Sequence, residues 1–216
     1  MGLTGKNNEE KAWNFLKGKI PNDFGVAGLM GELFAESGLN PQNLQNSYEK
    51  KLGFTDATYT AAVDSGSYAN FVHDSAGYGV AQWTFWSRKE ALLNYVRALG
   101  VSIGDLEAQL GFLYKELSES YPSVLAALKT ATSVRAASDK VLTDFERPAD
   151  QSEAVKIKRA SYGQTYYDKY AKAVASTPSE GGNNMSNSPL VNCTVKSPNH
   201  SGKRTHSIDT LTPHCV

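Results

Sequence analysis

The chain has 216 residues, of which 40% are apolar and 20% charged, enough for one well-filled core and a smaller appendage. Lysine plus arginine and aspartate plus glutamate each number 22, so the balanced charge argues against a basic field that would draw nucleic acid or an anionic membrane as the main partner. The two cysteines, Cys193 and Cys215, lie in the last quarter of the chain, which excludes a disulfide, a cysteine nucleophile or a thiolate metal site before residue 193.

Helical patterns begin near residue 11 and continue along most of the chain. Asn22 or Asp23 is suited to cap a helix through VAGLMGELFAE, and Ser87 with Glu90 forms the S-x-x-E pattern of a capping box before ALLNYVRAL. Gly100 then ends the second of these helices, because glycine readily adopts the left-handed conformation that follows many helix ends.

Three further helical patterns follow. The first is LEAQLGFLYKEL, the second begins at Ser133 and runs through VRAASDKVLTDFE, and the third is the long segment EAVKIKRASYGQTYYDKYAKAV. No set of alternating strands is evident, although a short hairpin would fit between Tyr48 and Tyr78. We therefore predict a mostly α, globular domain of about seven helices.

The composition changes after residue 175. Residues 176–189, STPSEGGNNMSNSP, contain no aromatic side chain and one charge, which predicts a flexible linker. Residues 190–216 are too few to bury a core of their own. The expected organisation is a main domain over residues 1–175, a linker over 176–189, and a tail or the beginning of a second domain over 190–216.

Glu36 is the first candidate for catalysis, in the stretch GELFAESGLNP. Val26, Leu29 and Leu33 precede it at helical spacing, so Glu36 continues an apolar stripe at the last turn of its helix. Partial burial and the negative end of the helix dipole are both expected to raise the pKa of this carboxyl group. A carboxylic acid that keeps its proton near neutral pH can protonate a departing sugar oxygen, and the break at Gly38 leaves room for a substrate. The alternative is a glutamate that merely ends an amphipathic helix at its solvent edge.

A second element, HDSAGYGVAQWTFWSRK, has the composition of a saccharide cleft. Small residues let the backbone approach a ligand, aromatic faces stack on sugar rings, and an amide reaches acetamido or hydroxyl groups. A buried turn with core aromatic residues is the alternative. The candidates for substrate binding are Ser37, Tyr78, Gly79, Gln82, Trp83 and, from the last helix, Tyr166.

The order ESGLNP followed by GYGVAQWT resembles the E-S motif and the later glycine- and glutamine-containing motif of lysozyme-like peptidoglycan glycosidases, which include goose-type lysozymes and lytic transglycosylases. Residues 11 to about 172 are more closely similar to the phage tail-type lysozyme domain, through AQWTFWSRKEALLNY, SIGDLEAQLGFLYKEL and FERPADQSEAVKIKRASYGQTYYDKY. The resemblance implies a lysozyme-like fold that cleaves the MurNAc-β-1,4-GlcNAc bond. It gives Glu36 the role of the acid and places Tyr78, Gly79 and Gln82 along the cleft.

A second carboxylate is harder to assign. An inverting glycosidase needs a base about 6.5–9.5 Å from the acid, and a retaining one needs a nucleophile at about 5–5.5 Å. We expect Asp74, near Gly79, to be the base at the lip of the cleft, with helix capping or loop solvation as the alternative. Asp56 and Asp64 are weaker candidates on polar segments. Lytic transglycosylases in this superfamily need only one glutamate.

Two other features have simpler interpretations. His73, beside Asp74, is expected to be a partly exposed loop histidine, since no other histidine precedes residue 200 and no G-x-S-x-G pattern occurs. Glu146 and Arg147, in the FERP segment, are expected to form an ion pair that orients the last helices. Neither feature predicts a metal site.

The tail, KSPNHSGKRTHSIDTLTPHCV, resembles the first strand of the N-acetylmuramoyl-L-alanine amidases of clostridial-type endolysins. That resemblance implies that His214 is a zinc ligand. A catalytic zinc site needs at least three protein ligands, and the others would lie beyond Val216. The tail is therefore interpreted as the truncated beginning of an amidase-like domain, or as a simple tail.

These features together predict an endolysin-like peptidoglycan hydrolase that acts, without a cofactor, on glycan strands of the bacterial wall. The alternatives are a lytic transglycosylase that leaves anhydro-muramic ends, and a non-catalytic wall-binding or phage tail module. The charged first 20 residues lack the pattern of a signal peptide, and no stretch has the roughly 18 apolar residues of a membrane span. We expect a monomer, made in the cytoplasm and delivered to the wall by a phage tail or released through a holin.

Overall fold

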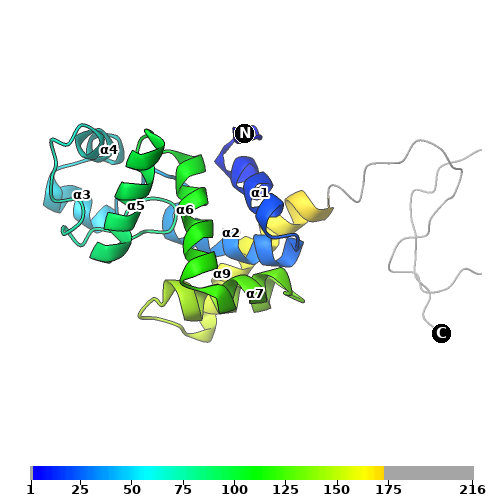
Figure 1. Cartoon of the computed structure of the whole chain (residues 1–216). Coiled ribbons are helices and arrows are strands. Elements are labelled where there is room, and N and C mark those ends of the chain that lie inside the picture. The colour runs from blue at the N-terminus through cyan, green and yellow to red at the C-terminus, as the bar shows by residue number, and fades with distance from the viewer. Residues whose placement is uncertain (1, 173–216) are drawn as a thin grey trace, which may run out of the picture. The chain divides into compact units, whose positions relative to one another are not determined.

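A computed structural model describes residues 2–172, and within them the protein is helical, as predicted (Figure 1). The described residues form nine α-helices and two π-helical turns, η1 and η2. In chain order these are α1 (Asn8–Lys19), α2 (Asp23–Ser37), α3 (Asn46–Leu52), α4 (Asp56–Asp64), α5 (Trp86–Leu99), α6 (Leu106–Glu119), α7 (Pro122–Lys129), α8 (Val134–Val141), η1 (Leu142–Glu146), α9 (Glu153–Tyr166) and η2 (Tyr167–Ala171).

The number of helices in residues 2–172 exceeds the predicted seven because the segment between Tyr48 and Tyr78, which has room for a hairpin, forms most of α3 and all of α4 instead. Backbone pairing in this region is limited to isolated bridges from Tyr78 to Leu44 and to Trp83. A further short helix, α7, begins at Pro122, because proline is well suited to the first helical turn. No helix in residues 2–172 is long and apolar enough to cross a membrane.

The local signals for helix ends had mixed outcomes. Asn22 caps α2, with its side chain accepting a hydrogen bond from the Gly25 amide at 3.0 Å, and Ser133 caps α8 in the same way. The Ser87 capping box was wrong. The helix begins at Trp86, with Ser87 inside its first turn, because the chain is already turned at Phe85, whose carbonyl accepts the first amide hydrogen bonds.

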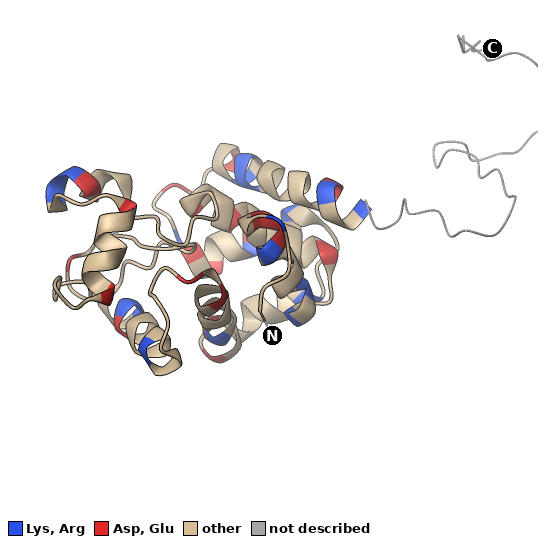
Figure 2. Cartoon of the chain, turned by 90° about the horizontal axis from the view of Figure 1, so that it is seen from above, with Lys and Arg blue, Asp and Glu red and all other residues tan. Residues whose placement is uncertain are grey.

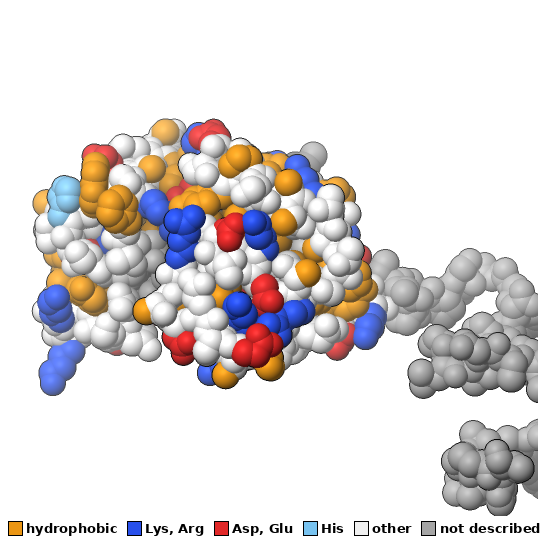
Figure 3. All heavy atoms as spheres, turned by 90° about the horizontal axis from the view of Figure 1, so that it is seen from below, with side chains coloured by type: hydrophobic (Ala, Val, Ile, Leu, Met, Phe, Trp, Pro, Cys, Tyr) orange, Lys and Arg blue, Asp and Glu red, His pale blue; other side chains and the backbone are white. Residues whose placement is uncertain are grey.

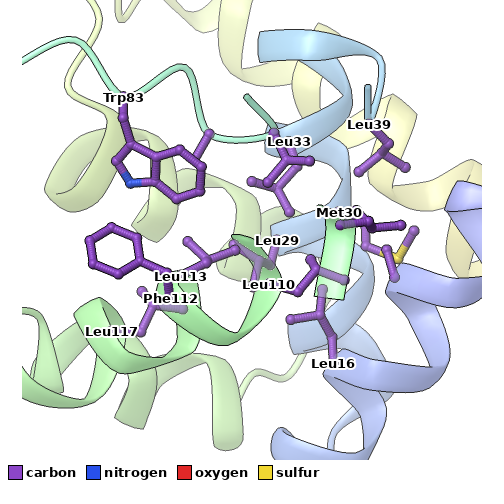
Figure 4. Close-up of a cluster of buried hydrophobic side chains, with 14 of the residues drawn as sticks. Leu16, Leu29, Met30, Leu33, Leu39, Trp83, Leu110, Phe112, Leu113 and Leu117 are labelled. Carbon is purple, nitrogen blue, oxygen red and sulfur yellow. The ribbon is translucent and has the colours of Figure 1, made fainter. Parts of the chain in front are cut away.

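Helix α2 is the centre of the domain. It packs against α9, α8, α1 and α7, and every residue from Gly25 to Leu33 is buried. Glycines permit this close packing: a Cβ atom built on Gly31 would lie 2.5 Å from the backbone nitrogen of Gly163 in α9. Figure 4 shows the apolar cluster that joins α2 to α6, drawn from Leu16, Leu29, Met30, Leu33, Leu39, Trp83, Leu110, Phe112, Leu113 and Leu117.

Helices α3, α4 and α5 lie at one end of the domain in Figure 1, and α1, α2, α7 and α9 lie at the other, with α6 between them. Acidic and basic side chains are interspersed over the described helices (Figure 2). No single-sign face is therefore evident there, in keeping with the balanced charge of the sequence.

Candidate active site

A cavity of about 570 Å³ lies at the C-terminal end of α2. Its walls come from the end of α2, the segment that follows it, the beginning of α5 and the end of η1. They are mainly polar, and the side chains that matter most for chemistry are Glu36, Asn43, Gln45, Gln82, Arg88 and Glu146. A polar cavity of this size suits a hydroxyl-rich ligand such as a sugar.

Glu36 reaches this cavity from the last turn of α2, which ends at Gly38 with a left-handed φ of 61°. Its side chain is 20% exposed and accepts a hydrogen bond from Arg159 Nη1 at 2.6 Å. Ser37 does not line the cavity. Its hydroxyl donates to the carbonyl of Val80 at 3.0 Å and so ties the end of α2 to the loop before α5.

Arg159 also anchors a second glutamate. The buried Glu32 accepts hydrogen bonds from Arg159 Nη1 at 2.8 Å and from the Ser138 hydroxyl at 2.6 Å. Burial raises the pKa of Glu32 above its ordinary value, against the lowering effects of Ser138 and Arg159. One guanidinium thus connects α9 to two turns of α2 and fixes the direction of the Glu36 side chain.

Glu146 is the second carboxyl group of the cavity. It is the last residue of η1, and Arg147 after it has a left-handed φ of 50°. Its Oε1 atom is buried and has no hydrogen-bond partner among the described residues. Burial raises the pKa of Glu146 well above its ordinary value, and the charge of Glu36 raises it further, against the opposing charge of Arg88.

The expected ion pair between Glu146 and Arg147 does not form within residues 2–172. Arg147 Nε donates instead to the carbonyl of Asp144 at 3.1 Å, in an exposed position. The reason is the π-helical turn η1. Because this turn is wider than an α-helical one, it directs Glu146 inward and leaves Arg147 outside. Such turns, and left-handed residues other than glycine, occur often at functional sites.

Asp74, expected at the lip of the cleft, is buried elsewhere. It forms an ion pair with Lys89 at 2.5 Å, and both side chains are fully buried. The hydroxyl groups of Tyr59 and Tyr68 also donate to Asp74, so the acceptor positions of its carboxylate are occupied by the protein. It does not line the Glu36 cavity. This placement gives the expected catalytic role of Asp74 no support.

The weaker candidates Asp56 and Asp64 also bind the protein itself. Asp56 accepts hydrogen bonds from the Leu44 amide and the Asn40 side chain, each at 2.9 Å. Asp64 accepts from the Ile103 amide at 2.8 Å. Neither lines the cavity of Glu36. Asp56 fixes the segment after α2, and Asp64 fixes the segment before α6.

Of the predicted binding residues, Gln82 lines the cavity. Its backbone has a φ of 43°, and its amide donates to Asn43 Oδ1 at 2.8 Å. This left-handed geometry is uncommon for a residue other than glycine, and it aims the side chain at the segment after α2. Asn43 and Gln45 on that segment line the cavity as well, although no sequence motif singles them out.

The remaining predicted binding residues belong to the core or to other surfaces. Tyr78 is fully buried, and its hydroxyl contacts that of Thr60 at 2.6 Å. Trp83 is also buried and donates from Nε1 to Glu116 at 2.7 Å. Gly79, with φ at 76°, turns the backbone against the side chain of Gln109. Tyr166, the last residue of α9, is 4% exposed and stacks with Tyr170 of η2. These four residues shape the loop and the core and do not line the cavity.

Within residues 2–172, no group of three histidine, cysteine, aspartate or glutamate side chains is arranged to hold a metal ion. His214, the zinc ligand expected from the amidase resemblance, lies outside the described residues, as do the predicted linker and the tail.

A helical domain with a glutamate at a helix end, facing a polar cavity, is the arrangement of lysozyme-like proteins. Residues 7–170 match the family model for the phage tail lysozyme, and the chain belongs to that family. Membership implies a lysozyme-like domain whose substrate is peptidoglycan. The match does not extend to residues 190–216 and lends no support to an amidase domain there. No curated protein matches the chain.

Proposed function

We propose that this protein is an N-acetylmuramidase that hydrolyses the MurNAc-β-1,4-GlcNAc bond of bacterial peptidoglycan, with Glu36 as the general acid. The observation that carries the proposal is the pair of carboxyl groups, Glu36 and Glu146, in one polar cavity. Two carboxyl groups flanking a glycosidic bond are what most glycosidases use. The amides of Asn43, Gln45 and Gln82 in the same walls suit the acetamido and hydroxyl groups of the substrate.

Glu146 takes the role of the base in place of Asp74. Glu146 lines the cavity, and no described residue forms a hydrogen bond with its buried Oε1 atom, so the protein leaves this side of the carboxyl group unengaged. The reactive form of the pair carries one proton, on Glu36; Glu146 is ionised in that form, and its raised pKa then makes it the stronger base. Asp74, in contrast, is fully occupied by Lys89 and two tyrosines.

In the proposed reaction, Glu36 gives its proton to the glycosidic oxygen, and the bond from that oxygen to C1 of MurNAc breaks through an oxocarbenium-like transition state. Glu146 accepts a proton from the attacking water, whose oxygen bonds to C1. Arg159 holds the Glu36 side chain in place and stabilises its carboxylate after the proton has left. The reaction therefore inverts the configuration at C1.

The test is digestion of purified peptidoglycan by the full chain and its Glu36→Gln and Glu146→Gln variants, with Glu119→Gln as the matched control. Glu119 is an exposed glutamate of α6 that pairs with Lys115 and does not line the cavity. We expect reducing-end MurNAc, first formed as the α-anomer, from the parent and the control. Each cavity variant should lose activity by at least about a hundredfold.

The other outcomes assign the alternatives. Anhydro-muramic ends would make the protein a lytic transglycosylase if Glu36→Gln abolishes them and Glu146→Gln does not. Glu146 would then have no role as a base. Retention at C1 would make Glu146 a nucleophile. If the parent and the Glu36→Gln variant bind the wall equally and neither digests it, the result would favour a non-catalytic module. Full digestion by Glu36→Gln would refute the assignment of the acid.

A further inference from the structure

Two aromatic side chains beside the cavity are exposed. Phe85 is 61% exposed and Trp86 is 50% exposed. Few large apolar side chains in residues 2–172 are exposed, and these two are the aromatic ones among them. Their ring centroids are 6.0 Å apart, and the His73 ring lies 6.3 Å from that of Trp86. We call these three residues the aromatic platform. Adjacent exposed aromatic rings commonly mark a binding surface.

The platform has a rigid base. Phe85 and Trp86 form the beginning of α5, where the Phe85 carbonyl accepts hydrogen bonds from the amides of Arg88 and Lys89 at 3.0 Å each. Both of those side chains are fixed by ion pairs, Lys89 with the buried Asp74 and Arg88 with Glu116. The rings therefore extend from an anchored helix end, so a ligand stacking on them would order little of the backbone.

A hollow of about 410 Å³ lies along the platform, and its walls also include Val72, Ser75 and Thr84. Thr84 and Phe85 line both this hollow and the cavity of Glu36. The two depressions are thus neighbours that share a wall. In Figure 3 the histidine drawn in pale blue lies beside a group of exposed apolar side chains on the face shown there.

We propose that the aromatic platform is an outer saccharide subsite, which stacks a sugar ring of the glycan strand beyond the two rings at the scissile bond. The proposal rests on the muramidase function proposed above. Its ligand is an N-acetylated sugar of the strand, because the shared wall continues the path of a chain that occupies the cavity. The hollow has no lysine or arginine among its lining residues, so it suits an uncharged sugar ring better than the carboxylates of a stem peptide.

The experiment measures kcat and KM of the full chain on peptide-free glycan fragments from tetrasaccharide to octasaccharide, for the parent, Phe85→Ala and Trp86→Ala. The control is Ile157→Ala, because Ile157 is 55% exposed on α9 and lines neither depression. We expect Trp86→Ala to raise KM on the octasaccharide on the order of tenfold, with little change in kcat and an effect that shrinks as the fragment shortens. Phe85→Ala should change KM in the same direction, and Ile157→Ala should not change it.

Binding measurements in the Glu36→Gln background separate this proposal from the proposed function. If the Glu36→Gln protein binds the octasaccharide and the added Trp86→Ala substitution weakens that binding about tenfold, the result supports the subsite even if the parent cleaves no substrate. An equal loss on short and long fragments would overturn the proposal, and so would no loss on any. The same measurements on peptide-bearing fragments of equal length complete the test, and a loss restricted to those fragments would overturn the proposal in favour of a stem-peptide site.

Discussion

Glu146→Gln should make the protein more stable at neutral and alkaline pH while it removes activity. The pKa of the Glu146 carboxyl group is raised well above its ordinary value, chiefly because the group is buried. A group with a raised pKa in the folded state contributes most to stability below its unfolded pKa, and this contribution is lost as the pH rises through the folded pKa. Glutamine has the same shape and does not titrate, so the variant escapes that loss.

The size of the stability difference follows from the titration of one carboxyl group. Between the unfolded and the folded pKa of Glu146, the difference in unfolding free energy between variant and parent should grow by about 1.4 kcal/mol per pH unit. Below about pH 4 the two proteins should differ little in this respect, because the carboxyl is protonated in both states and Oε1 lacks a partner in the described residues either way. Glu32, whose pKa is also raised, is present in both proteins, so its own titration contributes to both stability curves.

The assay is urea unfolding of the full chain at a series of pH values from acid to mildly alkaline, with Glu119→Gln as the control for loss of a surface charge. The reasoning is refuted if the difference between Glu146→Gln and the parent does not change with pH, or if the parent is the more stable protein at pH 8. A gain in stability combined with a loss of digestion is the expected trade between a strained site and its activity.

Two further substitutions test the placement of residues around the site. Asp74→Asn leaves the Lys89 charge buried without its partner, so it should cost about 3–5 kcal/mol in urea unfolding. The molecules that remain folded should keep their kcat, and a hundredfold lower kcat in fully folded protein would instead return Asp74 to the role of the base. Gly31→Ala places a Cβ atom 2.5 Å from the Gly163 backbone nitrogen and should lower stability by about 1–3 kcal/mol. A thermal midpoint that rises would mean that the intrinsic helix preference of alanine outweighs the contact between α2 and α9.

Local sequence signals specify the helical class and several helix ends. Asn22 caps α2, Ser133 caps α8 and Gly38 ends α2, because these signals depend on hydrogen bonds and backbone conformations within one turn of the chain. The position of Glu36 at the end of α2 is equally local. The resemblance of ESGLNP to a family motif is also a property of the sequence, and it is the source of the expectation that Glu36 is the acid.

Burial of aromatic side chains could not be predicted in the same way. Tyr78 and Trp83 have the chemistry of a sugar cleft and are fully buried, whereas Phe85 and Trp86, a few residues later, are exposed. An aromatic ring suits a core and a ligand surface equally well, so its residue type does not decide between them. The decision comes from which other helices cover it, and that depends on contacts distant in sequence.

The proposal of Glu146 in place of Asp74 likewise rests on tertiary contacts. Asp74 lies near the loop of the cleft in sequence, but Lys89 and Tyr59 enclose it, whereas Glu146, far along the chain from Glu36, enters the same cavity. The short-range patterns of a sequence specify which face of a helix is apolar and where the helix ends. Which carboxyl group loses its water and which gains a counter-charge depends on the packing of α2 against α8 and α9, and only the folded chain determines that.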